Sequence, residues 1–515
     1  MASAARRHWV LLTLLVVAWG LRVALCFGGG QFYWPDEMRY MRAKILVELL
    51  RTSPAHALDW WLTYPEHNFF MLISAVPLLV ERAVGGHFGV VPERVPGALI
   101  VPGLAYFPGA DAVAWHLPVL FLLLASVASV ALSYGIARRA GGSEREGLIA
   151  AALMTCATTM LYYSRHILPY DAALALTLLA LWVGIDEHGR ARRSFAAGIV
   201  ASLAFMTYNS YWILVAVALA LPFFVHRVSI ARAVTRGVAA AGGFVLIPAL
   251  VVLLGRARGK DVIGNLARFS TTVTQGDFDD GWRLPFAYLW ETEHGLLLVW
   301  CLSALAVVVL AYQGSAAARR RGLVWLAAAA AIYLFLGVGS NVLGRFVVYG
   351  RLVRQVVPFL CLAAASVLAQ VDVRSRWQRG LAVLGVLALA VQVLANFAAP
   401  VRQRFPAEVQ RQLTRTYGPL AKDTTVAGVW LVVDGKWQQS DPARAQARYV
   451  LLNAEFFNPF TAATKPVPSG VVLYRTRHPI QYPPYLYEGF TRAERTFLRA
   501  QDVSIRLVDR RPDGG

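Results

Sequence analysis

The chain has 515 residues, is 57% hydrophobic and carries a formal net charge of +20 at pH 7. Apolar runs long enough to cross a bilayer recur along it, which excludes a soluble globular protein and predicts a polytopic α-helical membrane protein. The basic residues stand between these runs, as the positive-inside rule describes for cytoplasmic loops. We therefore expect membrane lipid, and no nucleic acid, as a partner.

The first apolar run covers residues 9–27. Arg6 and Arg7 precede it, which predicts an N-terminus in the cytoplasm. No small-residue cleavage site follows the run, so we expect a retained membrane anchor and not a removed signal peptide. The four cysteines of the chain lie in or beside apolar runs, and we expect no disulfide framework.

The next stretch, residues 31–51, holds two adjacent carboxylates, Asp36 and Glu37, directly after Pro35. Proline can open a helix, and the free N–H groups of the first turn favour acids there. Apolar residues then recur at helical spacing with basic residues between them, which predicts an amphipathic helix on the membrane surface. The expected apolar face consists of Met38, Met41, Ile45, Leu46, Leu49 and Leu50.

The run 195–225 is too long for one helix, and its polar break at 207–210 predicts two short spans. The Pro/Gly-rich stretch 90–109 either crosses the membrane or re-enters it. A cytoplasmic N-terminus and an outer C-terminal tail need an odd number of crossings, so we expect 13 spans, with 11 as the alternative. The remaining predicted spans are 69–84, 113–137, 147–163, 172–185, 237–254, 286–311, 323–338, 352–370 and 380–398.

The tail, residues 400–515, has no apolar run of span length and alternates short apolar stretches with turn residues. This pattern predicts a small extracytoplasmic α/β domain containing the stretches TTVAGVWLVV, ARYVLLN and SGVVLYR. The chain therefore divides into a transmembrane domain, 1–399, whose first outer loop is 28–68, and a C-terminal domain, 400–515.

Four stretches that this topology places on the outer face carry unusual ionisable residues. Carboxylates can take a proton from an incoming nucleophile, and arginines can hold a phosphate by bidentate contacts. A single ionisable residue at a span end is often an interface anchor, but two adjacent acids are harder to explain in that way. The four stretches are Asp36/Glu37, Glu66/His67, Arg165/His166/Asp171 and Arg345/Arg351/Arg354.

Asp36, Glu66, His67 and His166 are residue types that can bind a metal. They lack the tight spacing of a metal-binding motif, so we expect no bound metal and no other cofactor. The acidic segment QGDFDDGW, 275–282, lacks the spacing of a calcium-binding loop, and we interpret it as a solvated turn.

The order of several motifs resembles the GT-C fold lipid-linked glycosyltransferases, in particular the bacterial protein O-mannosyltransferase and aminoarabinose transferase group. The first apolar run is followed by PDE-x-RY at 35–40, and Tyr64-Pro65 precedes the second run. Three later segments resemble that group's basic inner loop with its outward span, its paired short helices and its late arginine motif. These are ARRAGGSEREGLIAAALMTCATTMLYYSRHILPYDAALAL, AGIVASLAFMTYNSYWILV and YGRLVRQVVPFL, and the resemblance covers roughly residues 8–400.

The resemblance implies transfer of a sugar, with inversion, from a polyprenyl-phosphate donor to an acceptor hydroxyl on the outer face of the inner (plasma) membrane. By position it makes Asp36 the catalytic base, with Glu37 beside it and Asp171 as a second catalytic acid. It makes Arg39 and Arg354 the arginines that face the lipid phosphate. The full donor-binding set that we expect is Arg39, Glu66, His67, Arg165, His166, Arg351 and Arg354.

The chain departs from the family pattern at two places. The family often has H-P-P or E-K-P where this chain has Pro65-Glu66-His67, and the lysine that would contact phosphate is absent. Gln355 stands where tyrosine is usual. The donor sugar and the acceptor, which can be a protein, a lipid or a polysaccharide, are therefore left open.

A transporter or lipid flippase is the alternative function, and a membrane scaffold whose tail binds an envelope partner is a third class. Transporters place ionisable residues in mid-span on broken helices and often contain internal repeats. This sequence shows no repeat, its predicted spans are nearly free of charge and its acids lie in an outer loop. These features favour the enzyme.

Overall fold

The computed structural model describes most of the helical domain and the strands of the tail. The described residues are 2–27, 38–83, 116–226, 228–273, 281–309, 316–344, 348, 350–371, 375–402, 424–427, 431–433, 436–438, 449–453, 470–475 and 505–509. Several sequence predictions lie outside them: Gly28–Gly30, Asp36, Glu37, the stretch 90–109, most of the acidic segment 275–282 and Arg345.

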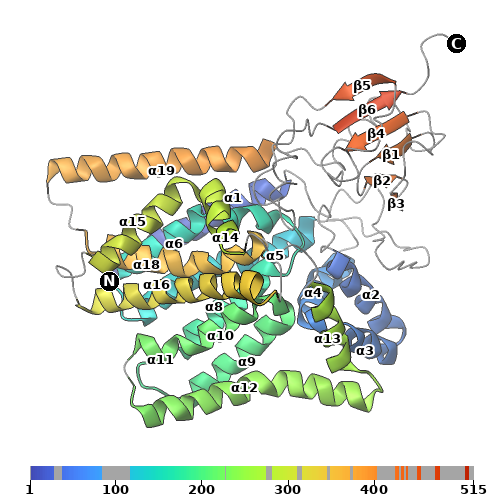
Figure 1. Cartoon of the computed structure of the whole chain (residues 1–515), viewed down its shortest axis with the longest axis horizontal. Coiled ribbons are helices and arrows are strands. Elements are labelled where there is room, and N and C mark those ends of the chain that lie inside the picture. The colour runs from blue at the N-terminus through green and yellow to red at the C-terminus, as the bar shows by residue number, and fades with distance from the viewer. Residues whose placement is uncertain are drawn as a thin grey trace.

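The first half of the chain folds into helices that pack side by side (Figure 1). Short 3-10 turns stand at the end of the predicted run 147–163, at residues 163–165, and at the predicted break of the run 195–225, at residues 209–211. The elements are α1 (Ala2–Phe27), α2 (Met38–Thr52), α3 (Pro54–Thr63), η2 (Pro65–His67), α4 (Asn68–Ala83), α5 (His116–Arg139), α6 (Glu144–Cys156), α7 (Thr158–Tyr162), η3 (Tyr163–Arg165), α8 (Tyr170–Gly184), α9 (Ala191–Thr207), η4 (Asn209–Tyr211), α10 (Trp212–Ala220), α11 (Pro222–Val225) and α12 (Ile230–Ala257).

The second half completes the helical domain, and in Figure 1 its last helix, α19, lies along the edge of the bundle opposite to α12. Its elements are α13 (Val262–Val273), α14 (Arg283–Glu293), α15 (Gly295–Val309), α16 (Ala316–Gly337), η5 (Val338–Val342), α17 (Gly350–Val353), η6 (Arg354–Val356), α18 (Val357–Leu368) and α19 (Arg376–Arg402).

The described helices confirm a polytopic helical membrane protein. Six of them are long and apolar enough to cross a membrane, and α6 with the segment that follows it, bent by 62°, can make a seventh. Four shorter apolar helices add to these, at 65–80, 170–184, 209–225 and 295–308. The total of 11–13 crossings stays a prediction. The six long spans are 9–26, 117–139, 230–257, 316–342, 350–368 and 376–395.

The predicted break at 207–210 is confirmed, because α9 ends at Thr207 and α10 begins at Trp212. The prediction of one span at 286–311 is wrong. The segment divides at His294, which has a positive φ of 44° and separates α14 from α15. Residues 291–295 read ETEHG, so the sequence did contain a polar break at the division, which the prediction of one span overlooked.

The amphipathic helix predicted after Pro35 exists as α2, and its buried face matches the expected one only in part, since Leu46 is buried as predicted. Tyr40, Ala43 and Val47 are buried, whereas Leu50 is 47% exposed. These three residues recur at helical spacing and face α3 and α4, against which α2 packs. The helix is therefore part of a small helical unit with α3 and α4, and its position on the membrane surface stays a prediction.

Helices α9 and α12 approach each other closely through glycines. A Cβ atom at Gly198 would lie 2.1 Å from the carbonyl oxygen of Ala240, and one at Gly243 would lie 2.0 Å from that of Phe195. Small residues permit such backbone contact between helices in membranes. This pair holds α12 against the rest of the helical domain.

The strands of the tail confirm that a sheet follows α19. A four-stranded sheet has the order β1-β4-β6-β5, in which β1 and β4 are parallel and the other neighbours are antiparallel. The strands β2 and β3 form a separate antiparallel pair. The strands are β1 (Thr424–Ala427), β2 (Leu431–Val433), β3 (Lys436–Gln438), β4 (Tyr449–Asn453), β5 (Val471–Arg475) and β6 (Ile505–Asp509).

Candidate functional site

A buried ion pair joins the start of α8 to η6. Asp171 lies in the first turn of α8, where the free N–H groups favour an acid, and its carboxylate pairs with the guanidinium of Arg354. Arg354 is fully buried, and its side chain also contacts the sulfur of Met160 at 3.7 Å and lies 5.2 Å from the ring centroid of Tyr163. Its Nε and Nη1 atoms have no hydrogen-bond partner among the described residues. A buried arginine with unused donors is suited to bind an anion.

Arg351 lies one turn before Arg354 and extends the same cluster. Its Nη1 atom donates a hydrogen bond to the hydroxyl of Tyr170 at 2.8 Å, and its guanidinium carbon lies 5.8 Å from the centroid of that ring. The hydroxyl of Tyr211 donates to the backbone oxygen of Arg351 at 3.3 Å. The late arginine motif is therefore fixed against both α8 and η4.

Aromatic rings form a continuous wall beside these arginines. The rings of Tyr163 and Tyr170 lie 5.7 Å apart between centroids, those of Tyr170 and Tyr208 lie 4.9 Å apart, and those of Tyr208 and Tyr211 lie 5.0 Å apart. All three pairs meet edge to face, the arrangement that aromatic quadrupoles favour. Aromatic faces of this kind suit a sugar ring and exclude water.

Glu66 and His67 lie beside the same region, because His67 contacts residues at the break after α9. His67 makes a hydrogen bond through Nδ1 to the backbone oxygen of Thr207 at 3.2 Å, and its ring stacks on Tyr208 at 5.6 Å. Glu66 accepts a hydrogen bond of 2.5 Å from Arg42 of α2. The guanidinium of Arg42 also lies over the ring of Tyr64 at 4.1 Å. Arg42 was missed as a site residue, because a single basic residue on an amphipathic helix suggests only surface charge.

Arg165 and His166 are buried between the site and α1. Arg165 is fully buried and interacts electrostatically with Cys26, near the end of α1. The ring of His166 lies 5.4 Å from that of Tyr162. Both predicted residues thus lie inside the protein.

A further buried arginine, Arg22 of α1, was also missed. It is fully buried, and its charge interacts with those of Asp171 and Arg354. The sequence contained a signal, since an arginine inside an apolar run of span length is costly and is commonly functional.

The structure therefore gathers Asp171, Arg351 and Arg354 into one cluster and connects His67 to it through tyrosine rings. The two acids on which the predicted chemistry depends, Asp36 and Glu37, lie outside the described residues. Arg39 is in the first turn of α2, and its side chain lies outside them as well. Within the described residues, no group of three or more His, Cys, Asp or Glu side chains is placed to hold a metal ion.

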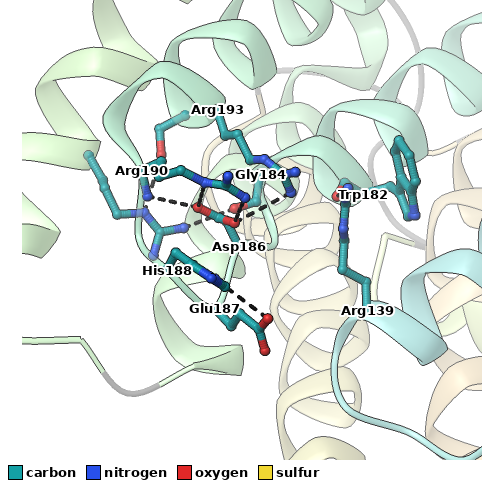
Figure 2. A network of polar contacts seen from close by, with 10 residues as sticks. Arg139, Trp182, Gly184, Asp186, Glu187, His188, Arg190 and Arg193 are labelled. Carbon is teal, nitrogen blue, oxygen red and sulfur yellow. Dashed lines mark hydrogen bonds and ion pairs between the residues drawn. The ribbon is translucent and has the colours of Figure 1, made fainter.

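A different ionic network lies at the other end of α8 (Figure 2). Asp186 accepts hydrogen bonds from the side chain of Arg190 at 2.7 and 3.0 Å and from its backbone N–H at 2.8 Å, and it pairs with Arg193 at 3.4 Å. The hydrogen bonds from Arg190 hold the pKa of Asp186 well below its usual value. Arg139 donates to the backbone oxygen of Trp182 at 2.6 Å, and Arg236 donates to that of Gly184 at 2.9 Å. These contacts tie α5, α8, α9 and α12 together.

A third ionic group lies inside the helical domain, where Arg321 of α16 makes two hydrogen bonds to Glu146 of α6, at 2.7 and 3.1 Å. Ser366 of α18 donates to the same carboxylate at 2.8 Å. Glu146, like Arg22 and Arg236, is buried within a helix. Glu146 and Arg236 each stand one residue before a predicted span, 147–163 and 237–254, so the prediction that the spans are nearly free of charge stays a prediction.

The bend between α6 and α7 is held by a carboxylate from a distant helix. Glu293, at the end of α14, accepts hydrogen bonds from the backbone N–H groups of Thr158 at 2.9 Å and Thr159 at 2.7 Å. These N–H groups are the free donors at the start of α7, and Glu293 satisfies them in the interior. Gln392 of α19 in turn donates to the backbone oxygen of Glu293 at 2.9 Å.

The chain matches no protein-family model, and no curated protein sequence matches it significantly.

Proposed function

We propose that this protein is a membrane glycosyltransferase that moves a sugar from a polyprenyl-phosphate donor to an acceptor hydroxyl. The observation that supports it most is the buried pair of Asp171 and Arg354, in which two guanidinium nitrogens have no partner among the residues that the structure describes. Arg351 and the tyrosine wall lie beside this pair. Together they offer positive charge for a phosphate and aromatic surface for a sugar.

In this mechanism Asp36 removes the proton of the acceptor hydroxyl. The acceptor oxygen forms a bond to the anomeric carbon while the bond from that carbon to the phosphate oxygen breaks, with inversion. The electron pair stays on the phosphate, whose growing negative charge Arg354 and Arg351 offset. Asp171 orients Arg354, and no acid is needed for a leaving group that departs as an anion.

Two buried amide side chains are suited to binding the hydroxyl groups of the sugar. Asn68, at the start of α4, and Gln355, next to Arg354, are both fully buried. Neither amide group has a hydrogen-bond partner among the described residues. Amides carry both donors and an acceptor, so they can bind sugar hydroxyl groups, which also act in both ways.

The proposal includes a location. The protein lies in the inner membrane of a cell envelope with a cytoplasmic N-terminus, and the arginine cluster and the tail face the outer side. The basic clusters near Asp186 and Arg321 then lie on the cytoplasmic side, in accord with the positive-inside rule. On the outer side of the membrane the tail can select the acceptor.

The test is release of free polyprenyl phosphate by the purified full chain in detergent, with a panel of polyprenyl-phosphate sugars. We expect release with at least one donor, and a loss of roughly 10²–10³-fold in Arg354→Gln, since such a donor to a developing anion contributes about that much. Arg256→Gln changes an exposed arginine at the end of α12 and serves as the control. Release that is equal in Arg354→Gln and wild type would contradict the proposal.

A lipid flippase is the second candidate, because the bend of 62° after α6 and the buried Glu293 are features that transporters share. A flippase would move a fluorescent polyprenyl-phosphate sugar across the membrane of a proteoliposome without releasing lipid phosphate. The enzyme would release lipid phosphate without requiring such movement. Measuring both quantities on one preparation separates the two functions.

A further inference from the structure

Arg22 lies near the end of the first span, three residues before the buried Leu25. Its side chain is fully buried. A charged residue at this depth costs several kcal/mol unless a partner compensates it, so it is rarely kept without a role. The family resemblance assigns no role to it.

Two of the three guanidinium nitrogens of Arg22 are held in place. Nε donates to the hydroxyl of Ser126 of α5 at 2.7 Å, and Nη1 donates to the backbone oxygen of Ala18 at 3.0 Å. The third, Nη2, has no hydrogen-bond partner among the described residues. Both partners are neutral, so they fix the direction of the guanidinium without compensating its charge.

The packing of α1 brings this charge to the site that Arg354 occupies. Helix α1 packs against α7 and η3, the two elements that supply Met160 and Tyr163 to the side chain of Arg354. Arg22 also interacts electrostatically with both Asp171 and Arg354. Among the described residues, one carboxylate therefore lies near two buried guanidinium groups, each of which has an unused donor.

This surplus of positive charge is suited to an anion that carries more than one negative charge. We infer that Arg22 and Arg354 together form a site for the dianion of a phosphate monoester. The inference rests on the proposed function, in which the donor is a phosphodiester with one negative charge and the leaving lipid phosphate is a monoester. A phosphate monoester carries about −1.5 to −2 at neutral pH, so the second arginine matches the charge that appears as the bond to the sugar breaks.

The test is a comparison of two lipids that differ in this charge and by one methyl group. Farnesyl phosphate is a monoester and methyl farnesyl phosphate is a diester, and each is titrated into the purified full chain at pH 7.5. We expect wild type to bind the monoester more tightly. We expect Arg22→Gln to lose at least about tenfold in affinity for the monoester, the value of one charge-assisted hydrogen bond, with a much smaller change for the diester.

Two further variants keep the test decisive. Arg22→Lys keeps the charge and should keep a preference for the monoester, and Arg256→Gln is the control for a distant arginine. If Arg22→Gln does not fold, Ser126→Ala removes a hydrogen bond that orients Arg22 but leaves its charge. This variant should weaken binding of the monoester more than that of the diester.

Unchanged binding in Arg22→Gln, or an equal loss for both lipids, would overturn the inference. If Arg22 supports monoester binding but no donor releases lipid phosphate, then the anion site stands and the proposed transferase fails. If release depends on Arg354 and binding does not depend on Arg22, the transferase stands and the role of Arg22 fails.

Discussion

At the scale of single residues, the site depends on one buried ion pair whose members are 183 positions apart. Removing one partner of such a pair leaves an uncompensated charge in the interior, whereas replacing both by apolar residues is often nearly neutral. Asp171 and Arg354 can therefore be tested for structure and for function separately.

Asp171→Ala should lower the stability of the protein by roughly 3–5 kcal/mol, because it leaves Arg354 charged, buried and without its carboxylate. Adding Arg354→Met should restore most of the loss in Tm, measured by thermal unfolding in detergent. The double variant should still release no lipid phosphate. Normal release from it would show that the pair serves the fold alone.

The sequence identified Asp171 and Arg354 through the order of motifs, but not their contact. A pairing across 183 residues depends on how α8 and η6 meet, and hydrophobic periodicity contains no information about that. Arg22 and Arg42 were missed for a different reason. Arg22 is one basic residue in an apolar run, and Arg42 is one of several basic residues on an amphipathic helix. Topology signals account for most residues of both kinds.

The ionisation of Asp186 predicts how the stability of the protein depends on pH. Its pKa in the folded protein is held below the unfolded value of about 3.9 by the hydrogen bonds from Arg190. The stabilisation is therefore fully present above about pH 4 and is lost as the pH falls further, through the folded-state pKa. Asp186→Asn should cost roughly 1.5–3 kcal/mol at pH 7, seen as a lower Tm.

The difference in Tm between wild type and Asp186→Asn should shrink as the pH falls below about 4, because Asp186 then takes up a proton in the unfolded state while its lower folded-state pKa keeps it charged in the folded protein. Glu187→Gln, at the exposed neighbour of Asp186, is the control and should leave Tm unchanged at both pH values. A difference that stays constant down to the lowest pH would contradict this account of the network.

At the scale of elements, two interrupted helices meet at Glu293. This residue ends α14, precedes the positive-φ residue His294 and supplies the acceptor for the first N–H groups of α7. One span was predicted at 147–163, which is largely apolar, and one at 286–311, although the polar residues 291–294 interrupt that run. The bends depend on a hydrogen bond between residues 135 positions apart, which local pattern cannot show.

Glu293→Gln should loosen the start of α7, because the amide lacks the charge that strengthens the bonds from Thr158 and Thr159. Hydrogen exchange at residues 158–162 should become roughly tenfold faster or more, as expected for a loss of about 1.5 kcal/mol. Exchange around Asp186 serves as the internal control and should not change. Unaltered protection at 158–162 would show that the bend does not depend on this carboxylate.

At the scale of the whole molecule, ionic groups occupy the two ends of α8. Asp171 opens the helix and Asp186 follows its last turn, about 22 Å away for 15 residues. Helix α12 runs in the opposite direction to α8, from Arg236 near Gly184 to its C-cap residue Arg258, which pairs with Asp59 of α3. The cluster at Asp171 and the unit formed by α2 and α3 thus lie toward one end, and the basic network of Figure 2 toward the other.

Helix positions were predictable from the sequence because span-length apolar runs are a strong signal, as α1, α5 and α19 show. The strands β1, β4 and β5 coincide with apolar stretches of the tail that the sequence singled out. The partner of β5, the strand β6, was missed because Ile505–Asp509 is short and contains two charged residues. The order of the strands depends on contacts between distant stretches and could not be predicted.

The orientation can be tested with single cysteines, in a background in which the exposed Cys301 is replaced by Ser. Thr52→Cys, on the end that we assign to the outer side, should react with a membrane-impermeant maleimide in intact cells. Glu187→Cys, beside the basic network, should react only after the membrane is permeabilised. The reverse pattern would place the arginine cluster on the cytoplasmic side and remove the proposed donor site from the outer face.

The central claim is that an acid of the first outer loop and a buried arginine cluster transfer a sugar from a lipid phosphate. Its most direct test is release of polyprenyl phosphate from a bound polyprenyl-phosphate sugar in a single turnover, comparing wild type with Asp36→Asn. We predict that the variant still binds the donor but releases lipid phosphate roughly 10²–10⁴ times more slowly, the usual contribution of a general base. Release at the wild-type rate from folded Asp36→Asn would contradict the account.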